Sequence, residues 1–245
     1  MTQSQWGRKI GVLTPATNVT VENELWSMRV EPATIATARI IIDAVDWTAP
    51  DGLQRFVEGV NARLPETAKR LQCKPDSLLL GISSSNLWGG LEGNRQIKAS
   101  IKADTGLDMT TPVDAMLAAQ HTLKFTRIGV VTPYPAVADE KIVAFFKEFG
   151  VEVVAQKSLH CTNPIEIGDV SEAVLRECLR EVNVPEAQAL VQLGTDLRMA
   201  SVAAQAEGWL GKPTLSVNAT TWWHCLRSND IRARISGWGQ LLAEH

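Results

Sequence analysis

Hydroxyl and amide side chains gather in four short segments, each of which follows an apolar run. The segments are Thr14-Pro-Ala-Thr-Asn-Val-Thr20, Ser83-Ser-Ser-Asn86, Thr132-Pro-Tyr-Pro135 and Gly194-Thr-Asp-Leu-Arg198. Hydroxyl, amide and backbone N–H groups near helix starts are suited to holding a carboxylate or an oxyanion. These segments therefore predict a site for a small carboxylate or carbonyl compound.

The apolar runs before these segments read as buried strands. Strand signals fall at 9–14, 34–42, 77–82, 108–111, 127–132, 151–155, 189–193 and 213–217, and helical periodicity is clearest at 51–71, 139–149 and 169–182. Strands that alternate with helices are typical of a parallel sheet covered by helices. Ligands of such sheets bind beyond the carboxyl ends of the strands, where the four polar segments fall.

The two halves of the chain repeat each other. Lys9-Ile-Gly-Val-Leu-Thr-Pro15 returns as Arg127-Ile-Gly-Val-Val-Thr-Pro133, and two weaker echoes, of 77–84 in 189–195 and of 106–111 in 211–216, keep the same order. We interpret this as a duplicated unit, although parallel strands resemble one another in any case. The sequence predicts an α/β fold of two pseudo-symmetric lobes, 1–117 plus 218–245 and 118–217. Each lobe is expected to be a parallel sheet flanked by helices, with the site in the cleft between them.

Composition narrows the possible partners. A net charge of -3 without a lysine or arginine stripe argues against nucleic-acid binding. No apolar stretch approaches the roughly 18 residues of a membrane span, and no secretory signal begins the sequence, so we expect a cytoplasmic protein. Four scattered cysteines fit reduced thiols without a metal site. The absence of a phosphate-loop motif leads us to expect no cofactor.

A family resemblance rests on five motifs in order. They are Gly11-Val-Leu-Thr-Pro-x-x-Asn18, Ser83-Ser-Ser85, Thr132-Pro-Tyr134, Gly194-Thr-Asp-Leu-Arg198 and Ser216-Val-Asn-Ala-Thr-Thr-Trp222. Together they resemble the maleate isomerase and arylmalonate decarboxylase group of the aspartate/glutamate racemase superfamily. The resemblance implies a cofactor-independent isomerase or lyase that acts on a small-molecule carboxylate through an enolate, and a homo-oligomer.

The resemblance also assigns residues to the site. It makes Ser84 and Tyr134 catalytic hydroxyl donors. The residues that it places around the substrate are Pro15, Asn18, Ser83, Ser85, Thr195 and Asn218.

The departure from the family pattern lies in the cysteines. Relatives that use two bases carry one cysteine at the exit of a strand in each half, whereas this chain has Ile82 and Gly194 at those places. Chemistry that depends on a thiol is therefore disfavoured. Asp196 can replace it as a general base or orient water, or it can simply cap the following helix. His224 is a secondary acid/base candidate that can equally pack against the neighbouring tryptophans.

Two other functions stay open at this level. A hydrolase could use the same donors for a tetrahedral oxyanion, with water activated by Asp196 or with Ser84 or Ser85 as nucleophile. A catalytically silent descendant would keep the same carboxylate cradle and only bind its ligand.

Overall fold

The computed structural model describes residues 6–47, 49–84 and 89–245, which form two four-stranded parallel sheets. The strands of the first sheet are β1 (Arg8–Pro15), β2 (Ala33–Ile40), β3 (Ser77–Leu80) and β4 (Met109–Thr110), in the order β2-β1-β3-β4. Those of the second are β5 (Arg127–Thr132), β6 (Glu152–Ser158), β7 (Ala189–Gln192) and β8 (Thr214–Ser216), in the order β6-β5-β7-β8. The two sheets thus have the same topology.

Helices connect the strands and cover the sheets. They are α1 (Thr20–Ser27), α2 (Gly52–Lys69), α3 (Gly90–Thr105), α4 (Pro112–Leu123), the 3-10 turn η2 (Ala136–Ala138), α5 (Asp139–Glu148), α6 (Pro164–Gly168), α7 (Glu172–Val182), α8 (Ala200–Leu210), α9 (Val217–Ser228) and α10 (Gln240–Glu244). Among the described residues, every helix is too short or too polar to serve as a membrane span.

Capping residues in the sequence explain where several helices begin. The hydroxyl of Thr111 accepts from the Asp114 N–H at the start of α4, where Pro112 occupies the first helical position. Ser171 and Ser216 cap α7 and α9 in the same way. Short polar side chains are favoured at this position because they satisfy N–H groups that lack a partner within the helix.

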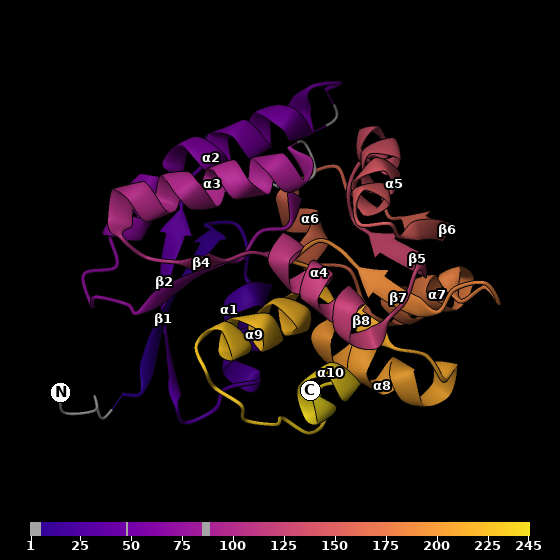
Figure 1. Ribbon diagram of the computed structural model, residues 1–245. Helices are drawn as coiled ribbons and strands as arrows, with labels where there is room; N and C mark the ends of the chain where they lie inside the picture. Colours follow the sequence, from indigo (N-terminus) through magenta and orange to yellow (C-terminus); the bar gives the residue numbers. More distant parts are fainter. Residues whose placement is uncertain (1–5, 48, 85–88) are drawn as a thin grey trace.

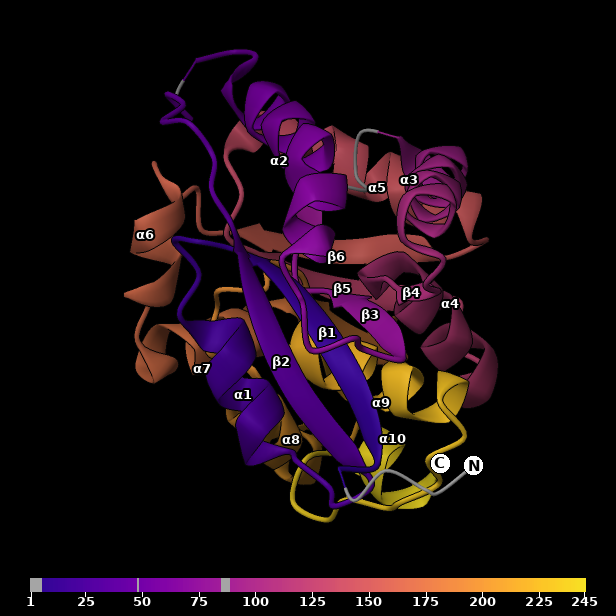
Figure 2. The same ribbon diagram turned by 90° about the vertical axis from the view of Figure 1, so that its left-hand side faces the viewer.

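The helices pack as layers around the two sheets. Figure 1 shows α2 and α3 side by side over the N-terminal sheet, and these two helices are in contact. In Figure 2 the β1–β2 pair faces the viewer and the strands β5 and β6 lie behind it. Helix α9 packs against α4 and α1 and also contacts α8, so the last part of the chain joins the two halves.

The predicted architecture is confirmed. All eight predicted strands occur within a few residues of their expected bounds, and the three helices expected at 51–71, 139–149 and 169–182 correspond to α2, α5 and α7. The three sequence echoes fall on β1 and β5, β3 and β7, and β4 and β8, which hold equivalent places in the two sheets. The lobe boundaries at 117/118 and 217/218 stay a prediction, because α9 contacts α1 of one half and α8 of the other.

Candidate active site between the two sheets

The exits of the central strands of both sheets converge on one small cavity of about 30 Å³. It is lined by Pro15, Thr17, Asn18, Trp47, Phe56, Ile82, Ser84, Tyr134, Pro164, Ile167, Gly194, Thr195 and Asp196. Both halves of the chain therefore contribute to its wall, as the parallel topology requires. The structure brings together the predicted residues Pro15, Asn18, Ser84, Tyr134, Thr195 and Asp196.

Asn18 has a fixed orientation because it also caps α1. Its Oδ1 accepts from the N–H groups of Thr20 (3.0 Å) and Val21 (2.9 Å). Since this oxygen is engaged by the helix, the amide Nδ2 must face the other half, where it donates to Thr195 Oγ1 (3.2 Å). One Nδ2 proton is left for a ligand. Arg39, at the end of β2, donates to the Asn18 carbonyl and holds this loop from behind.

Thr195 is built into the seam between the two halves. Its hydroxyl donates to the Gly81 carbonyl (3.2 Å) while accepting from Asn18. A hydroxyl has one proton. Thr195 can therefore donate to a substrate only by giving up its bond to Gly81, unlike the free donor that the sequence suggests.

Tyr134 in the cavity wall is paired with Ser83, which stands behind that wall. The Ser83 Oγ accepts from the Gly194 N–H (3.0 Å) and lies 2.8 Å from the Tyr134 Oη. If Ser83 donates to this oxygen, the Tyr134 O–H is free to donate toward the cavity. Burial raises the pKa of Tyr134 to about 12, against opposing hydrogen bonds from Ser83 and Ser84. The phenol therefore stays protonated near neutral pH and serves as a donor, not as a base.

Asp196 caps a helix, but not the helix that the sequence suggests. Its Oδ1 accepts from the Val19 N–H (3.0 Å) and the Thr20 N–H (3.1 Å), at the start of α1 in the opposite half of the chain. The Thr20 hydroxyl donates back to the Asp196 carbonyl (2.8 Å). Burial raises the pKa of Asp196, although the N–H groups of Val19 and Thr20 and the charge of Arg39 oppose the shift.

The backbone around Gly194 explains why no thiol stands there. Gly194 has a φ of +92°, and a Cβ at this position would lie 2.3 Å from Cγ of Pro133. Such a contact is far inside van der Waals distance, and the left-handed φ is unfavourable for residues other than glycine. The described residues of the cavity wall include no cysteine. Cys161 is buried outside that wall, and its burial raises its thiol pKa to about 11.

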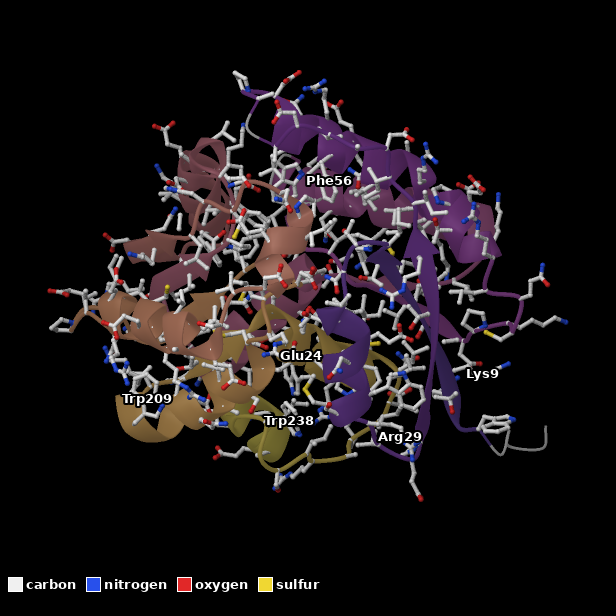
Figure 3. The ribbon with its side chains drawn as sticks, turned by 180° about the vertical axis from the view of Figure 1, so that it is seen from behind. Lys9, Glu24, Arg29, Phe56, Trp209 and Trp238 are labelled. Atoms are coloured by element: carbon white, nitrogen blue, oxygen red, sulfur yellow. The ribbon has the colours of Figure 1, made fainter. Side chains whose placement is uncertain are left out.

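A larger apolar hollow adjoins the cavity. It has a volume of about 290 Å³ and shares Thr17, Trp47, Phe56 and Pro164 with the cavity wall. Its remaining lining comes from the exit of β1, from the end of β2 with the segment after it, and from the start of α6, namely Ala16, Ile40, Ile41, Ile42, Asp43, Ala44, Val45, Asn163 and Ile165. The rings of Trp47 and Phe56 meet edge to face at 5.3 Å and form the boundary between the two spaces. Figure 3 shows Phe56 on α2.

Three of the predicted site residues that the structure describes do not line the cavity, namely Ser83, Asn218 and His224. Ser83 stands one layer behind it, and Ser85 falls outside the described residues. The Asn218 amide donates to the Thr195 carbonyl (2.8 Å) and to Glu24 (2.6 Å), so it supports the wall from behind. His224 faces Asp114 and Lys98 on the α4 side, and its burial lowers its pKa.

Sequence reasoning missed Glu24 and the aromatic wall. Glu24 shares the buried face of α1 with Thr20, Val21 and Leu25. A carboxylate on an apolar helix face is a signal that the sequence does contain, since buried charges need partners. Trp47 gives no such signal, because it lies outside both the strand and the helix patterns.

Fold and site define a two-lobed α/β protein with a small cavity of mixed polar and apolar lining at the strand exits between the lobes. The model of the arylmalonate decarboxylase family matches residues 31–242. The chain belongs to this family.

Relatives of known activity are similar over most of the chain. Maleate isomerase of Nocardia farcinica is 23% identical over 97% of this chain and 96% of its own length. Arylmalonate decarboxylase of Bordetella bronchiseptica is 26% identical over 80% of this chain and 81% of its own. These enzymes support isomerase or lyase chemistry and lend no support to the hydrolase alternative.

Solved structures agree on the fold. A mutant of the Nocardia farcinica maleate cis-trans isomerase with a covalently bound succinylcysteine intermediate superposes with a TM-score of 0.85 at 22% identity, over 97% of this chain and 99% of that one. A double mutant of arylmalonate decarboxylase in a liganded form gives a TM-score of 0.81 at 21% identity, over 97% of this chain and 100% of that one.

Proposed function

We propose that this protein is a cofactor-independent isomerase or lyase that acts on a small carboxylate through an enolate, without a catalytic thiol. The observation that carries the proposal is the meeting of Asn18, Ser84 and Tyr134 with the carboxyl group of Asp196 in one cavity. Neutral donors stabilise negative charge that develops on a substrate oxygen, and they do so best where water is excluded. A carboxyl group in the same wall can move the proton.

Each residue takes a part that its bonding allows. The second Nδ2 proton of Asn18 and the hydroxyls of Ser84 and Tyr134 hold the substrate carboxylate and the enolate oxygen. Asp196 exchanges a proton with the substrate carbon. Burial shifts the pKa of Asp196 upward, which is the direction that favours proton transfer by a carboxyl group near neutral pH.

The apolar hollow favours a substrate with an apolar substituent. The cavity that holds the polar donors has a volume of about 30 Å³, which is small beside typical ligand pockets of about 300 Å³ or more. The adjoining hollow of about 290 Å³ offers room for an alkyl or aryl group past Trp47 and Phe56. A substituted malonate or a substituted unsaturated acid would place its carboxylate on the polar wall and its substituent in the hollow.

An NMR time course in deuterated water tests the proposal. The purified protein is incubated with maleate, arylmalonates, alkylmalonates, unsaturated acids and cyclic imides. Deuterium at a substrate carbon, isomerisation or loss of a carboxylate supports enolate chemistry. Cleavage without exchange would overturn it in favour of a hydrolase, and an inert panel with measurable binding in favour of a binding protein.

The substitution Asp196→Asn separates catalysis from capping. Asparagine can accept the same N–H bonds from Val19 and Thr20, so the stability should change by no more than about 1 kcal/mol. It cannot exchange a proton, so turnover should fall by about 10²-fold to 10⁴-fold. Thermal unfolding and kcat measure the two effects. Full activity in a stable variant would show that Asp196 only caps α1 and takes no part in catalysis.

We also infer a cytoplasmic homo-oligomer. Trp6, Trp26 and Trp209 expose 59%, 42% and 42% of their surface, which a second copy of the chain would cover. Light scattering coupled to size-exclusion chromatography measures the mass, and a monomer at micromolar concentration would contradict this expectation.

A further inference from the structure

Glu24 is buried at a point where three elements meet. It is 8% exposed and lies on α1. Its Oε1 accepts from the Ala200 N–H at the start of α8 (2.8 Å), and its Oε2 accepts from the Asn218 amide of α9 (2.6 Å). In Figure 3 Glu24 lies between α1 and the side of the molecule formed by α8 and α9. The proposed chemistry does not use this carboxylate.

The Asn218 amide connects Glu24 to the cavity wall. Its Nδ2 donates both to Glu24 Oε2 and to the Thr195 carbonyl (2.8 Å). Because both partners are acceptors, the amide orientation is determined as long as Glu24 is ionised. A proton on Oε2 that points toward Asn218 would meet the amide hydrogens, and turning the amide so that Oδ1 accepts from the new O–H relieves this contact. An oxygen would then face the Thr195 carbonyl, and that hydrogen bond would be lost.

We propose that Glu24 is a positioning residue whose ionised form holds Asn218 on the Thr195 carbonyl, and that proton uptake by Glu24 turns Asn218 over and releases Thr195. The inference rests on the proposed function only because Thr195 and the adjacent Asp196 belong to the proposed site. Proton uptake by Glu24 would change the position of the segment that carries Thr195 and Asp196, and it takes no part in the chemical step.

The surroundings of Glu24 determine the pH at which it takes up a proton. Burial raises the pKa of Glu24 to about 7, and the hydrogen bonds from Ala200 and Asn218 oppose the shift. The charged group that faces Glu24 from the segment before α8 is Arg198, which is exposed and lowers the pKa slightly. Helix α9 presents the neutral amide of Asn218, and on α1 itself Glu22 is paired with Arg39. We therefore expect both forms of Glu24 to be populated near pH 7.

The test follows the side-chain amide of Asn218 by ¹⁵N NMR as a function of pH. In the wild-type protein the Asn218 amide signals should titrate with a midpoint within about one unit of 7. In Glu24→Gln they should be independent of pH and lie at the low-pH position of the wild type. The glutamine keeps an oxygen for the Ala200 N–H but presents an amide to Asn218, as the protonated carboxyl would.

Two variants control the assignment. Asp196→Asn should leave the titration in place, which excludes Asp196 as its source. Glu207→Gln should do the same, because Glu207 is also a partly buried carboxylate that accepts backbone N–H bonds, but its donors are Thr214 of β8 and Gln240 of α10, away from the site. Absence of a titration in the wild type, or its persistence in Glu24→Gln, would overturn the proposal. If that variant does not fold, the ¹³C titration of the Glu24 carboxyl in the wild type replaces it. A midpoint equal to that of the Asn218 amide supports the proposal, and a different midpoint overturns it.

The readout needs no substrate, so it separates this proposal from the proposed function. Where turnover is found, Glu24→Gln should lower kcat about tenfold or more through misplacement of the Thr195 segment, while Glu207→Gln should not. An inert substrate panel together with a titrating Asn218 would reject the enzyme and keep the switch. Turnover together with an Asn218 amide signal that does not change with pH would keep the enzyme and reject the switch.

Discussion

Asn18 and Asp196 each cap a helix and line the cavity, and the capping bonds fix how each side chain faces the cavity. Asn18 caps α1 with its oxygen and thereby aims its nitrogen at the cavity. Asp196 also caps α1, and it lines the cavity at the same time. Capping side chains are held by several N–H groups and lose little further entropy when a ligand binds. The site is therefore preorganised by the same bonds that begin the helix.

The close approach of Gly194 to Pro133 predicts that a cysteine cannot be restored there. Gly194→Cys forces a left-handed φ on a residue with a side chain and drives its Cβ into the proline ring. We expect a loss of stability on the order of 3 kcal/mol or more, measured by chemical denaturation. Gly208→Cys is the matched control, because a Cβ at this helical glycine meets nothing within 4 Å. Equal stability of the two variants would show that the loop adapts and that its backbone does not exclude a thiol.

At the scale of elements, the sequence was informative about strands and much less so about side-chain partners. Buried parallel strands read as continuous apolar runs, so β1, β3, β5 and β7 could be predicted from their own residues. The partners of Thr195 and Asp196 could not. Their hydrogen bonds reach Asn18 and Thr20, which lie 177 and 176 residues away, and no local pattern encodes how the two sheets dock.

A substitution at Asn18 tests whether its Oδ1 serves to cap α1 while its Nδ2 serves to bind the substrate. Asn18→Asp keeps an oxygen for the N–H groups of Thr20 and Val21, so the start of α1 should be preserved. The new buried carboxylate lies beside that of Asp196, so we expect a loss of stability on the order of 1 to 3 kcal/mol, measured by chemical denaturation. The substitution replaces the Nδ2 donor by a second carboxylate oxygen, which repels an anionic substrate. KM should rise about tenfold or more with the circular dichroism spectrum unchanged. An unchanged KM would remove Asn18 from the proposed carboxylate contacts.

At the scale of the molecule, two segments hold the sheets together along one seam. Residues 18–24 of one half meet residues 195–200 of the other in matching order: Asn18 with Thr195, Thr20 with Asp196 and Glu24 with Ala200. A second contact lies at α3, where Glu148 of α5 accepts from the Leu91 N–H (2.9 Å). The seam that joins the halves is thus also the wall of the site, and we expect changes in Glu24 to affect both.

The buried carboxyl in this seam predicts how stability depends on pH. The pKa of Glu24 is raised from 4.5 to about 7, so between these values the folded chain binds more protons at this group than the unfolded chain does. Its contribution to stability is therefore fully present below pH 4.5 and is lost as the pH rises through about 7. For a group that is 8% exposed, this amounts to roughly 2 to 4 kcal/mol. Urea unfolding of the wild type and of Glu24→Gln at several pH values measures it: the variant should gain this amount relative to the wild type between pH 4.5 and 7.5. Glu58→Gln, on the exposed face of α2, controls for the loss of one carboxyl. A constant difference between wild type and Glu24→Gln across this range would show that Glu24 is solvated in the folded chain and that the seam is open around it.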